Sequence, residues 1–210
     1  MAKLVLPKEY LSYSSLSLWK DDKPKFRRKY YENIQDKDTV YTIYGKVIHS
    51  LIEKDDKYKN IRLPVAEQKM QIKIKDVPII GYIDTFDPVT HDFAEYKSGI
   101  AKPDGSPRWD QVAVERHVQL PFYSFLIQQK YGTKVNKTFL VWLETRFKDN
   151  TLVIGGVKLG GERELELTGR HEIFHRKLYQ YDRDWVEDWI IKSAKEISED
   201  YQTWLSTSAK

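Results

Sequence analysis

Hydrophobic residues recur at two different spacings along the chain, and the change between them separates predicted helices from predicted strands. At residues 39–54 apolar side chains repeat about every 3.6 residues, which predicts a helix with His49 on its inner face. Gly45 lies one turn before His49 and costs about 1 kcal/mol of helix propensity relative to alanine, which indicates a close approach to the backbone there. From residue 67 to residue 98 the period falls to two, the pattern of half-buried strands.

The segment of period two predicts three successive strands. The first spans residues 67–76 and is expected to end at the Val-Pro pair of residues 77–78. The second spans residues 79–87, and the turn "PVTH" connects it to a third strand at residues 92–99. Glycine and proline then punctuate a predicted surface loop, "GIAKPDGSPRWD".

The second half of the chain continues the alternation of helices and strands. Helical spacing returns at residues 109–132, where Pro121 is expected to kink the helix or to mark a restart. Two further strands are predicted at residues 137–147 and 151–161. Residues 172–206 are predicted to form a C-terminal helical extension, with one amphipathic stripe that packs against the core. The length of 210 residues, without an internal repeat or a linker, indicates that the whole chain is one domain.

Composition narrows the classes of protein to which the chain can belong. Hydrophobic residues make up 40% of it, enough for a packed core. The absence of cysteine excludes disulfides, thiolate nucleophiles, cysteine-bound zinc and an iron–sulfur cluster. No apolar run approaches the roughly 20 residues of a membrane span or forms a signal peptide, so we expect a soluble protein with no membrane partner. The net charge of +4 permits a polyanionic partner without identifying one.

Two acidic residues in the predicted strands are expected to face each other. If the "PVTH" turn closes a simple hairpin with Asp87 opposite Asp92, the same register places Asp84 directly across from Glu95. Directly opposed carboxylates repel each other unless they share a proton or a cation. Their oxygen atoms suit Mg²⁺ or Mn²⁺, so the pair is a candidate metal site. A slip of one residue would turn Asp84 to the other face of the sheet.

A lysine follows the second of these acids at a spacing that places both on one face of the strand. Lys97 comes two residues after Glu95, so its ammonium group is expected beside the metal position, where it could orient or help to deprotonate a water molecule. The alternative interpretation is a ladder of surface charges on an antiparallel sheet. Three other acid-x-lysine pairs have no opposed acid on a neighbouring strand: Glu67–Lys69, Asp21–Lys23 and Asp55–Lys57.

These residues belong to an ordered series of short motifs. The serine-rich "LSYSSL" comes first, followed by Gly45-x-x-x-His49, "GYID", "EYK" and Gln119-x-x-x-Tyr123. Between residues 11 and 143 this series resembles the RecB-like branch of the PD-(D/E)xK nuclease superfamily. The resemblance implies an α/β (α+β) fold with a restriction-endonuclease-like core, in which helices flank a mixed central β-sheet. Without cysteines, the chain is similar to the cluster-free, stand-alone members, such as small phage-type or mitochondrial-type exonucleases.

The resemblance also assigns roles to individual residues, while the residues alone leave alternatives open. His49 could be an ordinary buried, hydrogen-bonded histidine, and Gln119 and Tyr123 could be interior packing residues with one hydrogen bond. Some relatives carry an acid before the first strand, where this chain has Glu67. The resemblance implies that one or two Mg²⁺ or Mn²⁺ ions are bound by His49, Asp84, Glu95 and the Tyr96 backbone carbonyl. The catalytic residues that it implies are Lys97, Asp84, Glu95, Gln119 and Tyr123.

Together, the residues and the resemblance predict a Mg²⁺- or Mn²⁺-dependent DNA exonuclease that processes DNA ends in recombination or repair. A structure-selective or site-specific endonuclease on the same core and a non-catalytic DNA-binding subunit are the alternatives. Basic residues that flank the site in sequence are expected to contact DNA, although a solvated surface is the other interpretation of the first three: Arg27, Arg28, Lys29, Lys102, Arg108 and Arg116.

Expectations about partners and location follow from the same resemblance. Besides DNA, a single-strand annealing protein or a helicase is a candidate partner, because the helicase domains of the larger RecB proteins are absent here. A homo-oligomer, such as a ring, stays open. We expect a cytoplasmic protein of a bacterium or a phage-infected cell rather than a mitochondrial one.

Overall fold

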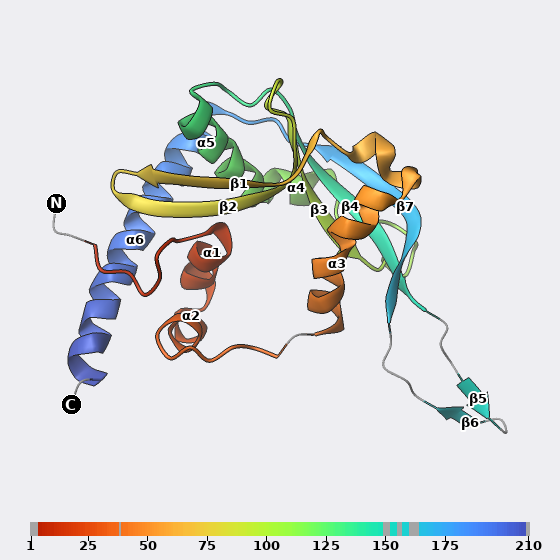
Figure 1. Cartoon of the computed structure of the whole chain (residues 1–210), viewed down its shortest axis with the longest axis horizontal. Helices are drawn as coiled ribbons and strands as arrows, with labels where there is room; N and C mark the ends of the chain where they lie inside the picture. The colour runs from red at the N-terminus through yellow and green to blue at the C-terminus, as the bar shows by residue number, and fades with distance from the viewer. Residues whose placement is uncertain (1–3, 38, 149–151, 155–156, 160–163, 209–210) are drawn as a thin grey trace.

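The computed structural model describes residues 4–37, 39–148, 152–154, 157–159 and 164–208, with the backbone alone for residues 40, 41, 46, 152–154 and 157–159. Its centre is a mixed five-stranded sheet in the spatial order β1-β2-β3-β4-β7 (Figure 1). The β3–β4 pair is parallel, and the other three pairs are antiparallel. These strands, and the hairpin of β5 and β6, are β1 (Val65–Ile74), β2 (Val77–Phe86), β3 (Phe93–Gly99), β4 (Thr138–Phe147), β5 (Leu152–Ile154), β6 (Val157–Leu159) and β7 (Leu165–His175).

Helices pack on both faces of the sheet, which is the α/β architecture expected from the sequence. On one face, residues such as Leu16, Leu126 and Ile190 of α1, α5 and α6 form the main core with β1, β2 and β3. On the other face, Ile48 of α3 packs with Val141 of β4. The helices are α1 (Tyr13–Asp21), α2 (Lys23–Tyr30), α3 (Val40–Lys54), the 3-10 helix η1 (Asp56–Ile61), α4 (Gln111–Arg116), α5 (Gln119–Tyr131) and α6 (Gln180–Ser208).

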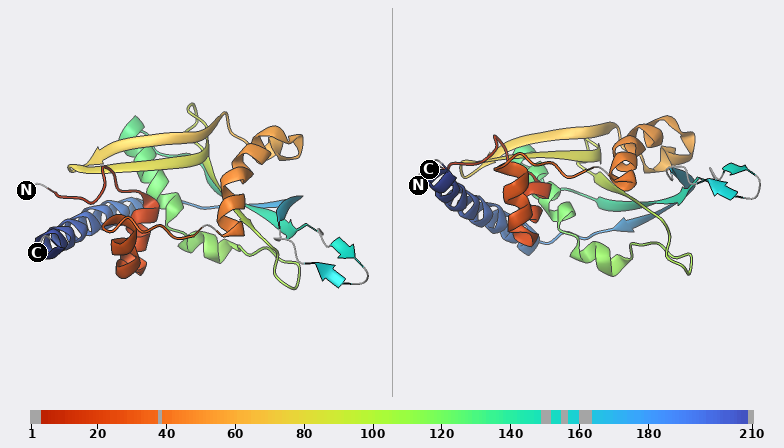
Figure 2. Two further views of the ribbon diagram at one scale, coloured as in Figure 1. Left: turned by 60° about the horizontal axis from the view of Figure 1, so that its bottom comes forward. Right: turned by 90° about the horizontal axis from the view of Figure 1, so that it is seen from below.

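The N-terminal helices are joined to the long C-terminal helix. Figure 2 shows α1 beside α6, and the Trp19 indole N–H of α1 donates a 3.1 Å hydrogen bond to Glu196 of α6. The helix α1 begins with a capping box in which Ser12 and Ser15 each bond to the other's backbone N–H. Among the described residues, no helix is long and apolar enough to cross a membrane.

The β1–β2 hairpin turns two residues earlier than the sequence pattern predicts. Lys75 and Asp76 form the turn with φ angles of 44° and 71°, the left-handed values that a tight two-residue hairpin requires. The expected break at residues 77–78 is therefore wrong, because both residues belong to β2. Pro78 is tolerated there, since it is the second residue of the strand, where a missing N–H interrupts little of the ladder.

The helix expected over residues 109–132 is divided in two. The helical bonds stop at His117 and Val118, and α5 restarts at Gln119. Pro121 is the third residue of α5, where its missing N–H would have no partner within the helix. Pro121 therefore marks a restart, one of its two expected effects.

The C-terminal helix begins later than the sequence pattern predicts. Residues 172–175 belong to β7, which pairs with β4 so that Glu172 lies opposite Trp142. The prediction of a helical extension over residues 172–206 is therefore wrong at its start, because sheet pairing satisfies this backbone and α6 begins only at Gln180. The strand expected over residues 151–161 lies partly outside the described residues, and its described parts belong to the separate β5–β6 hairpin.

Candidate active site

The candidate site lies beside the turn that joins β2 to β3. The Asp87 N–H donates a 2.9 Å hydrogen bond to the Asp92 carbonyl oxygen, and Thr85 pairs with Ala94. These contacts confirm the hairpin register that the "PVTH" turn predicts. The paired part of β2 and β3 is short, however, and the two strands separate after Thr85 and Ala94.

At the point of separation a side chain replaces the backbone as hydrogen-bond acceptor. Asp84 Oδ2 accepts a 2.6 Å hydrogen bond from the Tyr96 N–H of β3. The Tyr96 hydroxyl in turn donates to the Ile61 carbonyl oxygen (3.0 Å), which holds this part of β3 against η1. The Asp84 carboxylate is thus fixed between the two diverging strands. Glu95 directly precedes Tyr96, the residue to which Asp84 is bonded.

Glu95, Lys97 and two residues of α5 form one hydrogen-bonded network. Lys97 Nζ donates to Glu95 Oε1 and to Gln119 Oε1, each at 2.8 Å. Gln119 Nε2 donates to Glu95 Oε1 (2.5 Å) and to the Tyr123 hydroxyl (3.3 Å). Glu95 is only 4% exposed, so these charges do not form a surface ladder. Gln119 also does more than pack, because its amide makes three hydrogen bonds.

His49 approaches the acids from α3. Its Nδ1 lies 3.7 Å from Asp84 Oδ1 and 3.9 Å from Glu67 Oε1, beyond hydrogen-bond distance. This nitrogen is buried and has no hydrogen-bond partner in the part of the chain that the structure describes. The structure therefore does not support the alternative of an ordinary, hydrogen-bonded histidine.

Burial changes the acidity of both carboxyl groups. It raises the pKa of Asp84, against the opposing effects of the Tyr96 N–H and the Lys97 charge. It also raises the pKa of Glu95, to which repulsion from Asp84 adds and which Lys97 partly offsets. Two buried carboxylates so close together are unfavourable as a doubly ionised pair unless a proton or a cation neutralises them.

The side chains at the site fit a hard divalent cation in their chemistry. Across the described ranges, no three or more His, Asp or Glu side chains are arranged to hold a metal ion as they stand. Two buried atoms nevertheless lack a hydrogen-bond partner, His49 Nδ1 and Glu95 Oε2. A cation bound by His49, Asp84 and Glu95 would supply the missing partners and would remove the repulsion between the acids.

A glycine in β2 makes room for the tyrosine of α5. A Cβ atom at Gly81 would lie 2.8 Å from Tyr123 Cε1 and 3.1 Å from Leu126 Cδ1. Only glycine therefore leaves room for the Tyr123 ring in the position in which its hydroxyl accepts from Gln119. Gly45 differs, because a Cβ atom there would meet no described atom within 4 Å, so none of the described residues makes the close approach expected at Gly45.

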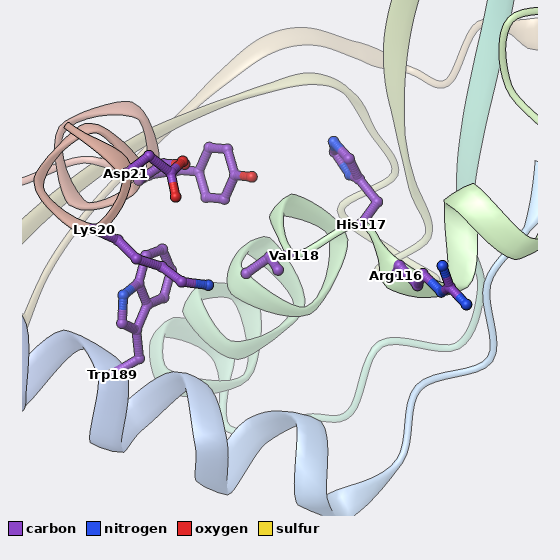
Figure 3. Close-up of a pocket in the computed structure, with 8 residues that line it drawn as sticks. Lys20, Asp21, Arg116, His117, Val118 and Trp189 are labelled. Carbon is purple, nitrogen blue, oxygen red and sulfur yellow. The ribbon is translucent and has the colours of Figure 1, made fainter.

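One cavity borders the site, and a second is lined in part by His117 and Val118, which directly precede Gln119. One, of about 190 Å³, is lined on the α3 side by His49, Arg62 and Asp84 among others. The other, of about 210 Å³, lies between α1, the junction of α4 and α5, and α6. Figure 3 shows Lys20, Asp21 and Trp189 on one side of this second cavity and Arg116 and His117 on the other. Its lining residues are Tyr13, Ser17, Lys20, Asp21, Arg116, His117, Val118 and Trp189.

Three of the basic residues expected to contact DNA lie in the segment between β3 and α5. Arg108 Cδ is 3.7 Å from the Cβ position of Gly99, at the end of β3. Arg116 lines the second cavity. The Lys102 N–H donates a 2.9 Å hydrogen bond to the Ser106 carbonyl oxygen, so Lys102 belongs to a folded loop between β3 and α4.

The other three basic residues lie on the short helix α2. Arg27 forms an ion pair with Asp200 near the C-terminal end of α6, which links α2 to that helix. Lys29 Nζ lies 5.7 Å from the centre of the Tyr30 ring, and Arg28 lies between Arg27 and Lys29 in the same turn. Three of the six residues thus lie on α2 and three between β3 and α5, and their contact with DNA stays a prediction.

A third acidic residue, Glu67 of β1, lies in line with Asp84 and was not among the site residues predicted from the sequence. In β1 it falls between the paired residues Ala66 and Gln68, directly across from Asp84, and its φ angle is 46°. Glu67, Asp84 and the position of Glu95 thus follow one another across three strands. A turn at residues 75–76 places Glu67 opposite Asp84, so the sequence could have predicted this pairing. The break expected at residues 77–78 gives a different register, in which the two residues are not opposite each other.

Comparisons with known proteins support the fold. No protein-family model matches the chain, and no curated protein matches its sequence. A crystal structure from Eubacterium rectale described as "Putative exonuclease" matches over 90% of this chain and 82% of that one, with 12% identity and a TM-score of 0.57. A "phage related exonuclease" from Haemophilus somnus 129PT matches over 87% and 79%, with 12% identity and a TM-score of 0.49. At 12% identity, the first likeness establishes a shared fold.

Proposed function

We propose that the protein is a metal-dependent deoxyribonuclease that hydrolyses phosphodiester bonds from DNA ends. One observation carries the proposal: the buried network of Glu95, Lys97 and Gln119 beside Asp84, at the point where β2 and β3 separate. A fold that binds DNA passively has no need for two neighbouring acids and a lysine at such a point. The shared fold with a protein described as "Putative exonuclease" agrees with this class of reaction.

The proposed metal site consists of side chains and one backbone carbonyl from α3, β2 and β3. His49, Asp84 and Glu95, with the Tyr96 backbone carbonyl, would hold one or two Mg²⁺ or Mn²⁺ ions. When bound, such an ion activates water and neutralises charge on the leaving oxygen. An imidazole ligand suits Mn²⁺ better than Mg²⁺, so we expect good activity with Mn²⁺.

Lys97 is the residue that we assign to the reacting phosphate. Its ammonium group has three N–H donors, of which one points to Glu95 and one to Gln119. The third remains for a phosphate oxygen or the attacking water. Because two fixed partners orient the group before substrate arrives, its charge is already placed where negative charge develops in the transition state.

The proposal is tested by digestion of end-labelled linear DNA and covalently closed circular DNA with Mg²⁺, with Mn²⁺ and with EDTA. An exonuclease releases nucleotides from the linear substrate only, and only with a divalent ion. Cutting of the closed circle would assign an endonuclease on the same core. DNA binding without cutting under either ion would leave a non-catalytic DNA-binding subunit and overturn the proposal. Trimming of ends in recombination or repair is the role that the motif series implies for such an enzyme.

A further inference from the structure

The hairpin of β1 and β2 has one face that is turned away from the core. Residues of alternate positions, such as Met70, Ile74 and Ile79, are buried against the helices. The residues between them point to the opposite face, where they form three cross-strand pairs: Lys69 with Tyr82, Gln71 with Ile80, and Lys73 with Pro78. Lys69, Gln71 and Lys73 are exposed, as is Tyr82. We call these six residues the outer hairpin face.

The outer hairpin face leads directly to the candidate active site. Tyr82 precedes Asp84 by two residues on β2, so both side chains leave the strand on the same side. Lys69 follows Glu67 by two residues on β1. The pair nearest to the acids is therefore Lys69 with Tyr82, whose side chain is 53% exposed.

The two lysines of this face carry charge that no described acidic residue pairs with. Neither Lys69 nor Lys73 forms an ion pair with any residue that the structure describes, whereas Lys75 at the turn lies 2.8 Å from Glu187 of α6. Lys130 of α5 adds a third ammonium group at the edge, because its Nζ lies 3.5 Å from the Lys69 carbonyl oxygen. Since Lys69 and Lys73 are four residues apart, their Cα atoms are about 13 Å apart along the strand and can reach different phosphates.

We propose that the outer hairpin face binds a single-stranded segment of DNA and guides it to Asp84. Lys69 and Lys73 contact its phosphates, and an unpaired base stacks on the exposed Tyr82 ring. Aromatic side chains stack on any unpaired base, whereas the bases of an intact duplex are already stacked, so the ring selects a single strand. This inference rests on the proposed function, because the bound strand is the substrate of the hydrolysis site.

The inference is tested by equilibrium binding of a fluorescein-labelled single-stranded oligonucleotide in EDTA, where no cutting occurs. We expect Tyr82→Ala to weaken binding about 5- to 150-fold and Tyr82→Phe to retain it, since stacking needs the ring and not the hydroxyl. Lys69→Ala and Lys73→Ala should each lower the slope of log affinity against log salt by about 0.7. Lys195→Ala, an exposed lysine on α6, is the matched control and should change neither quantity.

Any other result of the binding measurements contradicts the inference. Unchanged affinity and salt slope in the Tyr82 and lysine variants, or no binding by the wild-type protein, would overturn it. An effect of the lysine variants without an effect of Tyr82→Ala would overturn the selection of a single strand. Digestion assays on the same wild-type preparation keep the two claims apart: cutting with unchanged variant binding rejects only the outer hairpin face, and variant-sensitive binding without cutting rejects only the nuclease.

Discussion

At the scale of single residues, Gln119 determines how the charged groups of the site are held. Its oxygen accepts from Lys97, and its nitrogen donates to Glu95 and to the Tyr123 hydroxyl. An amide can make these bonds in one orientation only, since oxygen and nitrogen have opposite roles. Lys97 is therefore oriented by α5 as well as by its neighbour on β3.

The position of Tyr123 gives a prediction about Gly81. Gly81→Ala would place a methyl group 2.8 Å from Tyr123 Cε1, so the ring must move and Gln119 loses a partner. We expect the free energy of unfolding to fall by about 1–3 kcal/mol, the usual cost of an overpacked core, together with a loss of nuclease activity. Chemical denaturation and DNA digestion measure the two effects.

Gly45→Ala is the matched control for this substitution. A Cβ atom at Gly45 would meet no atom of the described part of the chain within 4 Å, and alanine favours a helix interior by about 1 kcal/mol over glycine. The control should leave stability unchanged or raise it. If Gly81→Ala were as stable as Gly45→Ala, the role of Gly81 in positioning Tyr123 would be refuted.

The burial of His117 predicts that stability depends on pH below about pH 6.5. Burial, with the positive charges of Lys97 and Arg176, lowers the pKa of His117 to about 4 from its ordinary value of 6.5. Between these values the unfolded chain binds more protons than the folded one, so the contribution to stability is complete above about pH 6.5 and declines as pH falls toward 4. His117→Gln removes this dependence.

Urea unfolding of the wild-type protein and of His117→Gln at pH 7.5 and pH 5 measures the effect. Acidification affects the other titrating groups equally in both proteins, so their difference isolates His117. We expect the wild-type protein to lose roughly 1–2 kcal/mol more than the variant between the two pH values. Equal losses would contradict the burial of a neutral His117.

At the scale of elements, the separation of β2 from β3 creates the site. The hairpin register could be predicted from the turn alone. Opposite residues are equally far from the turn, so a turn that pairs Asp87 with Asp92 also places Asp84 opposite Glu95. The separation could not be predicted, because it depends on Asp84 taking the N–H of Tyr96 from the ladder. The alternation of hydrophobic and polar residues in β2 and β3 does not indicate where the two strands stop pairing.

Other elements show where sequence patterns lose their information. β7 is an edge strand, and most of its residues are only partly buried, so no clear alternation marks it. Its last residues were predicted as helix for that reason. The helix α3 was predictable because Ile48 and Ile52 keep one buried stripe, but the inward approach of His49 to Glu67 depended on a turn at residues 75–76 that the pattern misplaced.

The start of α6 is held by a buried ion pair, which gives a prediction about stability. Arg176 and Asp182 are 2.9 Å apart, and each side chain is 7% exposed. Arg176 also donates to the His117 carbonyl oxygen (2.6 Å), and Asp182 accepts the Tyr179 N–H (2.9 Å). The pair therefore joins the end of β7, the α4–α5 junction and α6.

Asp182→Ala removes the buried partner of Arg176 and leaves only the half-exposed Glu115, whose Oε2 lies 3.8 Å from Arg176 Nε, so we expect a loss of about 3–5 kcal/mol in the free energy of unfolding. Lys75→Ala is the control, because the Lys75–Glu187 pair is 2.8 Å apart but its two side chains are 57% and 31% exposed. Such a surface pair contributes at most about 1 kcal/mol. Similar losses in both variants by denaturant unfolding would show that the Arg176–Asp182 pair does not hold these elements together.

At the scale of the whole molecule, the site depends on three parts of the chain that are distant in sequence. α3 brings His49 to one side, the β2–β3 junction supplies Asp84, Glu95 and Lys97, and α5 brings Gln119 to the other side. Helices on both faces of the sheet are needed to hold this arrangement. Composition and motif order could indicate the participants, but their meeting depends on the packing of both layers.

The most direct test compares the rates at which purified variants digest linear DNA with Mn²⁺, Mg²⁺ or EDTA. We predict digestion by the wild-type protein only with a divalent ion, and rates at least about 100-fold lower for Asp84→Asn and Lys97→Ala. Asp76→Asn, in the exposed β1–β2 turn, and Lys195→Ala are matched controls that should digest at the wild-type rate. Digestion by Asp84→Asn and Lys97→Ala at the wild-type rate, or digestion in EDTA, would contradict the assignment of this site.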